Sequence, residues 1–184
     1  MHSKTIERII SGNTQLAKFW SSSHGWAPKE AAELMSKSRL DWQVELSKTL
    51  QIWSSLDSKP GELILAWANL GALVEGTLKL FLSVFYQDYS TDEFSLKNKG
   101  KLVDPDVLAL EKLRQFFIKK QLLDQDDLGL IEKVQQRRNA IHAFKDRPIG
   151  TESEFLECVN LYLEFLVGIN NRLPYPDDCY RPQF

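Results

Sequence analysis

Leu63 to Tyr86 reads LILAWANLGALVEGTLKLFLSVFY, and no other stretch carries as much information about the architecture of this chain. Large apolar residues recur every three or four positions and keep to one face for roughly six turns: Leu63, Trp67, Leu70, Val74, Leu78, Phe81 and Phe85. The other faces are largely apolar too. Because a helix that is apolar nearly all round has to be buried, the pattern predicts the central helix of a bundle.

A membrane span is the competing interpretation of this stretch. Four polar residues interrupt it before about 18 clean apolar residues accumulate: Asn69, Glu75, Thr77 and Lys79. We therefore expect a core helix in a soluble protein, with no membrane partner. Residues 1–12 mix charged and apolar side chains, which is not the pattern of a secretory signal, so a cytoplasmic location is expected.

Composition limits the class of protein. With 184 residues, 43% of them hydrophobic, the chain is long enough for one domain with its own core. Its 23 basic and 25 acidic residues leave a net charge of −2, so a nucleic acid would have to be held by a local basic patch. Cys158 and Cys179 form no C-x-x-C pair, and neither a metal nor another cofactor is expected.

Apolar positions recur at intervals of three and four throughout the chain, and no Asn-Gly or Asp-Gly hairpin signal is present. The sequence predicts an all-α fold, an up-and-down bundle of four to five long helices. We expect residues 26–173 to form this bundle domain. Residues 1–25 are expected to form an N-terminal helical arm, broken near Ser11-Gly12-Asn13, and the proline-rich residues 174–184 an extended tail.

Turn and cap signals place the other helices. Pro28 suits a first helical turn, and an apolar stripe that includes Trp42 and Trp53 predicts one helix from there to about Leu56. The further expected segments are a loop over 88–103, a helix opened by Asp104-Pro105 with Val107 facing inward, a helix over 125–144, and a last helix capped by Thr151-x-x-Glu154.

One polar cluster has a specific chemical meaning. Residues 135–144 read QQRRNAIHAF and place Arg137, Arg138, Asn139 and His142 near a helix end. A phosphodiester needs a fixed positive charge for its oxygens and a group that moves protons near neutral pH, which guanidinium and imidazole supply. On a regular helix Arg138 and His142 share one flank, while Arg137 lies on the opposite flank. Asn139 points further toward solvent, where it could orient a phosphate or the imidazole.

Residues 137–142, RRNAIH, resemble the R-x4-6-H signature of HEPN (higher eukaryote and prokaryote nucleotide-binding) domains, in which a polar residue, often asparagine, follows the arginine. Arg137 and His142 meet the spacing. Arg138 meets the pairing with Asn139 but leaves only three residues before the histidine, so both arginines remain candidates. The motif covers one helix, and the helical bundle that the resemblance implies matches most of residues 28–172.

The resemblance implies a metal-independent endoribonuclease acting on single-stranded RNA, often a toxin or defence component with an antitoxin partner, and working as a homodimer with facing motifs. It also implies that some members are inactive and bind nucleotides or proteins. RNA cleavage agrees with the dimer, because one group must take a proton from the 2′-hydroxyl and another must protonate the leaving 5′-oxygen. His2 lies near the terminus and His24 in a serine-rich turn, so each chain offers only His142.

Plainer interpretations of the cluster compete with this one. The helix dipole favours arginine and histidine near a helix C-terminus by roughly 0.3–1 kcal/mol without any function. In a non-catalytic interaction module, the arginines would face solvent singly or pack on acidic residues of their own chain such as Glu154 or Asp146.

Two other features could carry function. Trp42, Trp53 and Trp67 could line the apolar cavity of a helical ligand-binding regulator, although aromatics at helical spacing are typical of core packing. Glu75 and Lys79, four residues apart, predict an ion pair at a helix edge or a dimer seam.

Overall fold

The computed structural model describes residues 2–54 and 59–184, and in this part of the chain the predicted all-α class is confirmed. The helices are α1 (His2–Trp20), α2 (Lys29–Lys37), α3 (Leu40–Thr49), α4 (Pro60–Val84), α5 (Tyr86–Thr91), α6 (Leu110–Lys119), α7 (Gln125–Arg138) and α8 (Glu152–Arg172). The strands β1 (Lys97–Asn98) and β2 (Lys101–Leu102) form a small antiparallel ribbon.

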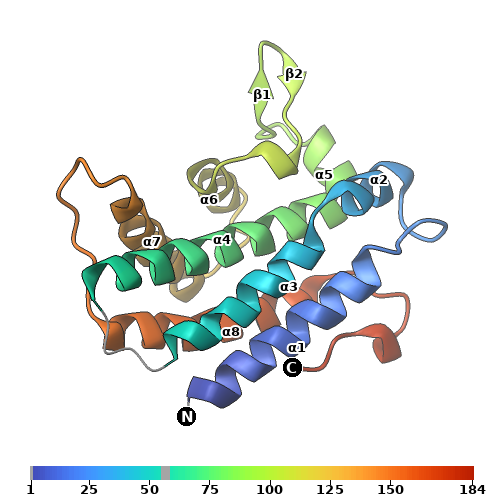
Figure 1. Ribbon diagram of the computed structural model, residues 1–184. Coiled ribbons are helices and arrows are strands. Elements are labelled where there is room, and N and C mark those ends of the chain that lie inside the picture. The colour runs from blue at the N-terminus through green and yellow to red at the C-terminus, as the bar shows by residue number, and fades with distance from the viewer. Residues whose placement is uncertain (1, 55–58) are drawn as a thin grey trace.

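α4 contains the apolar stretch and runs through the middle of the molecule (Figure 1). It contacts α2, α3, α6, α7 and α8, and Leu70, Val74 and Leu78 have no exposed surface. By length and composition α4 is the one described helix that could cross a membrane, but 61% of its most apolar stretch is buried inside the protein. This burial is that of a core helix in a soluble protein.

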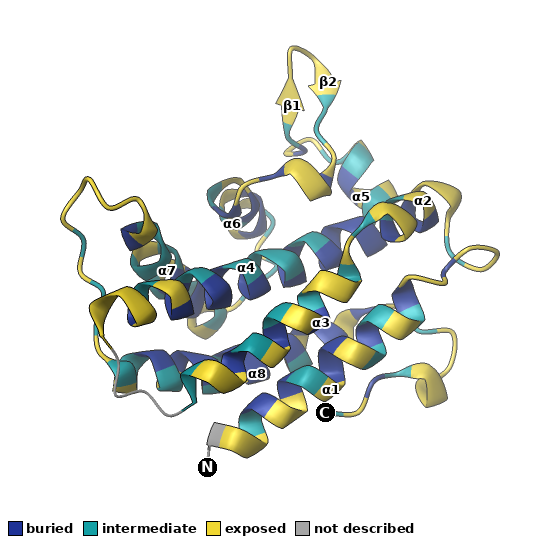
Figure 2. Cartoon of the chain, in the orientation of Figure 1, coloured by how far each residue is buried: buried dark blue, intermediate teal, exposed yellow. Residues whose placement is uncertain are grey.

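α1 departs from the expected arm, because it runs without a break through Gly12 and packs against α3 and α8. Figure 2 shows buried and exposed residues alternating along α1, and Ile9 and Trp20 belong to the core. The predicted break near Ser11-Gly12-Asn13 is wrong. Gly12 is a packing glycine instead: the ring of Phe184 lies against it, and a Cβ there would overlap that ring.

The single helix expected from Pro28 to about Leu56 is two helices, α2 and α3, separated at Ser38. The backbone of Ser38 is extended, and its hydroxyl donates a hydrogen bond to the carbonyl of Met35, which ends α2. Trp42 is therefore rotated out of the apolar stripe and is 57% exposed, with the guanidinium of Arg39 over its ring. A 3₁₀ turn over 50–53 follows α3, and Leu56 lies outside the described residues.

The segment between α4 and α6 is more structured than the expected loop. Lys99 and Gly100 both have positive φ and form the two-residue turn of the β1–β2 ribbon, although this turn contains neither Asn-Gly nor Asp-Gly. Asp104 does not cap a long helix, because it accepts a hydrogen bond from the hydroxyl of Tyr86. Only a 3₁₀ turn follows it, and Val107 is 69% exposed rather than buried.

The capping box of α8 is present as predicted: the Thr151 hydroxyl accepts from the Glu154 backbone, and the Glu154 carboxylate accepts from the Thr151 backbone. After α8 the chain contains a 3₁₀ turn over 178–180 and returns to α1. There the side-chain amide of Gln15 donates a hydrogen bond to the backbone carbonyl of Gln183 and accepts one from its backbone N–H. The tail is thus part of the packed structure and not extended throughout.

Asp127, in the first turn of α7, gives a prediction for stability. Burial, followed by the nearby charge of Asp124, raises the pKa of Asp127 to about 6. The folded protein therefore binds this proton more tightly than the unfolded chain, whose aspartates titrate near pH 3.9. Stability from this site is fully present below about pH 4 and is lost as pH rises to about 6.

We expect Asp127→Asn to raise the free energy of unfolding by about 1 kcal/mol at pH 7, a value discounted for partial exposure, and by almost nothing at pH 4. Urea unfolding at several pH values measures this difference. Asp106→Asn, an exposed carboxylate outside this helix, is the control. A stability gain that is the same at pH 4 and pH 7 would contradict the assignment.

Candidate functional site

The helix that carries the RRNAIH motif ends earlier than predicted. α7 stops at Arg138, residues 139–141 form a 3₁₀ turn, and His142 follows in non-helical conformation. The chain has to turn back here toward α8, and the indole N–H of Trp67 holds the carbonyl of Ile149 at 2.7 Å. The expected helix to Phe144 is therefore wrong, and positions after Arg138 no longer follow a helical wheel.

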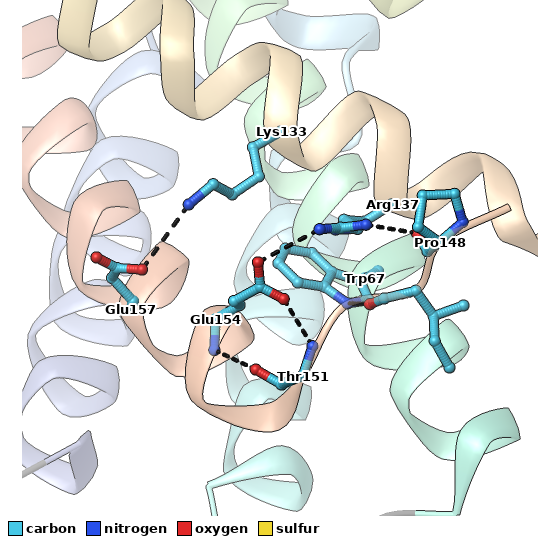
Figure 3. Close-up of polar contacts among 8 residues, drawn as sticks. Trp67, Lys133, Arg137, Pro148, Thr151, Glu154 and Glu157 are labelled. Atoms are coloured by element: carbon cyan, nitrogen blue, oxygen red, sulfur yellow. Dashed lines mark hydrogen bonds and ion pairs between the residues drawn. The ribbon is translucent and has the colours of Figure 1, made fainter.

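Arg137 points toward α8 and has a structural environment (Figure 3). Its guanidinium donates to the carbonyl of Pro148 at 2.9 Å and to the carboxylate of Glu154 at 3.3 Å. The backbone N–H of Thr151 and the charge of Arg137 lower the pKa of Glu154. Only 17% of the Arg137 side chain is exposed, so this arginine fastens the 142–150 segment to the start of α8.

Gly150 permits this arrangement. Its φ is +70°, a left-handed conformation that L side chains rarely adopt. A Cβ at this position would also meet the Glu154 carboxylate and the Arg137 guanidinium. The turn before α8 and the Arg137–Glu154 ion pair therefore depend on the same glycine.

Arg138 points the other way, over α4. Its Nη1 donates to Glu75 Oε2 at 2.9 Å and to the carbonyl of Gly71 at 3.2 Å. The aliphatic part of the side chain lies on Gly71, where a Cβ would overlap Cδ of the arginine. Gly71 is thus the position at which α7 reaches across α4.

The carboxylate of Glu75 is shared by two cations. Lys79 Nζ lies 2.8 Å from its Oε1, on the side not used by Arg138. Burial alone would raise the pKa of Glu75, but Lys79 and then Arg138 outweigh it and the pKa is lowered. Two positive charges against one negative charge leave a local excess of positive charge. The predicted Glu75–Lys79 pair is confirmed, and the structure adds Arg138 to it.

A groove of about 390 Å³ opens beside this triad. Asn139, Ile141 and His142 line it from the turn after α7, and Arg138 contributes its side chain. From α4 come the small and charged residues Ala68, Ala72, Glu75, Gly76 and Lys79. The His142 side chain is exposed and makes no hydrogen bond or ion pair with any described residue, so its imidazole is available to a ligand.

Three of the four predicted site residues therefore meet in one groove: Arg138, Asn139 and His142. Arg137 does not line it. The sequence indicates Lys79 only as the partner of Glu75, because Arg138, which also binds Glu75, is 63 positions away along the chain. A groove of this kind can place a phosphate oxygen near two cations and its ester oxygen near an imidazole.

Two apolar residues in the segment after α7 are exposed: Ile141, which lines the groove, and Phe144, which lies two residues after His142 in the sequence. Ile141 is 48% exposed, and the ring of Phe144 has no contact that covers it, with a relative exposure of 109%. Phe144 was expected in the last turn of a helix over 125–144, but the chain leaves the helix before this residue.

The tryptophan alternative loses its geometric basis. Trp67 is fully buried against Phe155, and Trp42 is exposed on α3, so these two cannot line one cavity. An apolar pocket of about 280 Å³ exists elsewhere, and Phe81, Phe85 and Phe116 but no tryptophan line it. Among the described residues no three His, Cys, Asp or Glu side chains are grouped as metal ligands.

No protein-family model, no curated protein and no solved structure matches this chain.

Proposed function

We propose that this chain is a HEPN-like protein of the cytoplasm that acts on single-stranded RNA as a metal-independent endoribonuclease. The observation that supports the proposal is the groove in which an unpaired imidazole, His142, lies with Arg138 and Lys79 over a single shared carboxylate. Asn139 completes the polar lining. Arg137 is left out of the proposed site, since its guanidinium is engaged with α8.

The chemistry needs a base, an acid and a cation. One imidazole accepts the proton of the 2′-hydroxyl, the 2′-oxygen forms a bond to phosphorus, and the bond from phosphorus to the 5′-oxygen breaks as a second imidazole donates a proton to it. Arg138, with Lys79 beside it, stabilises the added negative charge on the phosphoryl oxygens. The products are a 2′,3′-cyclic phosphate and a free 5′-hydroxyl.

A homodimer supplies the second imidazole. Each chain offers one histidine in the groove. The apolar surface that a two-fold contact would cover is formed by the exposed Ile141, which lines the groove, and by Phe144, two residues after His142 in the sequence. Such a contact brings the two His142 side chains to one composite site. A regulatory antitoxin partner, as in toxin and defence systems, would bind over the same surface.

Phe144→Glu tests the dimer. We expect the wild type to sediment as a dimer in the micromolar range and the variant to dissociate at least about 30-fold more readily, because a carboxylate on each side of a two-fold contact meets its own copy. Val107→Glu, at an exposed apolar residue elsewhere, is the matched control and should remain dimeric. A monomeric wild type, or a dimeric Phe144→Glu variant, would contradict the proposed arrangement.

The direct assay is incubation of the purified chain with a labelled single-stranded RNA in the presence of EDTA. Fragments ending in a 2′,3′-cyclic phosphate are expected. RNA that stays intact at high protein concentration overturns the nuclease proposal.

A second candidate function is a non-catalytic interaction module that binds nucleotides or a protein. The ion pairs of Arg137 with Glu154 and of Arg138 with Glu75 favour it, because paired arginines also have a purely structural use. This alternative predicts that substitution of Arg137 or Arg138 lowers the free energy of unfolding and does not change RNA cleavage.

A further inference from the structure

A second polar pocket lies on the other side of Asn139 and has no role in the function proposed above. It measures about 290 Å³ and is formed between α6, the end of α7 and the residues just before α8. Asn139 lines both this pocket and the His142 groove, so the two are neighbours around the turn that ends α7. We refer to it as the Arg147 pocket.

Arg147 lines this pocket with hydrogen-bond donors that have no partner among the described residues. Its Nε is buried and has no hydrogen-bond acceptor among the described residues, and its guanidinium forms no ion pair with them. A buried guanidinium N–H without an acceptor is costly, so such groups normally meet a carboxylate, a phosphate or a carbonyl. The guanidinium N–H groups of Arg147 are therefore suited to bind an anionic ligand.

The acidic residues of the pocket are already used. Glu111 accepts hydrogen bonds from Gln135 at 2.8 Å and from Arg114 at 3.2 Å, and these bonds lower its pKa. Glu132 is exposed and accepts from Gln136. Because two acidic and two basic residues balance in formal charge, recognition here depends on the directed donors of Arg147 rather than on net charge.

Amides complete the lining. Gln136 and Asn139 present groups that both donate and accept hydrogen bonds, which suits the edge of a nucleobase. We propose that the Arg147 pocket binds one nucleotide unit, with its phosphate on Arg147 and its base against these amides. This assignment rests on the proposed action on RNA. The pocket would then hold the nucleotide next to the phosphodiester that is cleaved at His142.

Binding of 5′-AMP, adenosine and inorganic phosphate, followed by NMR or calorimetry, tests the pocket. We expect 5′-AMP to bind more tightly than adenosine or phosphate, and Arg147→Gln to weaken it about 10- to 100-fold, the effect of losing a charge-assisted pair. Lys145→Gln removes an equal charge from the same exposed segment but lines no part of the pocket, and should leave binding unchanged. Thermal unfolding of both variants checks that they fold.

Equal affinity of Arg147→Gln and wild type for 5′-AMP, or phosphate binding as tight as 5′-AMP binding, overturns the assignment. The salt dependence of oligonucleotide binding separates it from the nuclease proposal, since loss of one phosphate contact lowers the logarithmic slope by about 0.7. If the wild type cleaves RNA but Arg147→Gln has the same salt dependence of oligonucleotide binding, the nuclease proposal stands and the assignment of the Arg147 pocket is overturned. If Arg147→Gln loses 5′-AMP binding but the wild type does not cleave RNA, the pocket binds a nucleotide and the nuclease proposal is overturned.

Discussion

His142→Ala is expected to lower the rate of metal-independent RNA cleavage by about 1,000-fold. General acid–base catalysis typically contributes 100- to 10,000-fold, and in a homodimer the substitution removes the acid and the base together. The free energy of unfolding should change by less than about 0.5 kcal/mol, because the imidazole is exposed and unpaired. His24→Ala, at an exposed histidine that lines no part of the groove, is the control and should cleave normally.

Mixed dimers make this test sharper. If one composite site uses the histidine of each chain, a dimer with one wild-type and one His142→Ala subunit should lose nearly all activity. If each chain carried an independent site, the mixed dimer would keep half. Equal cleavage by wild type and by the doubly substituted dimer would show that the activity does not come from this groove.

The helical class and the central helix could be predicted because they depend on local periodicity. Leu70, Val74 and Leu78 recur at helical spacing, and the helix is buried because most of its surface is apolar. The division between α2 and α3 could not be predicted in this way, because it depends on one serine hydroxyl and an extended backbone. Gly12 shows the same limit: only contact with Phe184, 172 residues away along the chain, distinguishes a packing glycine from a helix breaker.

The candidate site was located in the sequence, but its geometry was not. The helical wheel correctly separated the directions of Arg137 and Arg138, since both belong to α7. The wheel does not apply after Arg138, because the helix ends there and the chain turns back to α8. Arg138 and His142 still line one groove, but the 3₁₀ turn and not a continuous helix brings them together. Glu75 could be recognised only as the partner of Lys79 on its own helix, while its second partner comes from α7.

The two arginines are expected to separate stability from activity. Arg137→Met should lower the free energy of unfolding by about 1–2 kcal/mol, because it leaves the carbonyl of Pro148 and the carboxylate of Glu154 without a mostly buried donor. Arg138→Met should cost less than about 1 kcal/mol, since Lys79 continues to neutralise Glu75. Methionine keeps the apolar stem of each side chain, so packing changes little.

Cleavage should show the opposite order. Loss of the Arg138 guanidinium removes a charge from the groove and should lower the rate about 100- to 1,000-fold, whereas Arg137→Met should cleave at nearly the wild-type rate below its unfolding transition. Urea unfolding and RNA cleavage, measured on both variants, test this separation.

A catalytic loss confined to Arg137→Met would show that Arg137, which meets the R-x4-6-H spacing, stabilises the phosphoryl oxygens in place of Arg138. Loss of stability alone in both variants would favour the non-catalytic module, because the two ion pairs would then explain why these arginines are present.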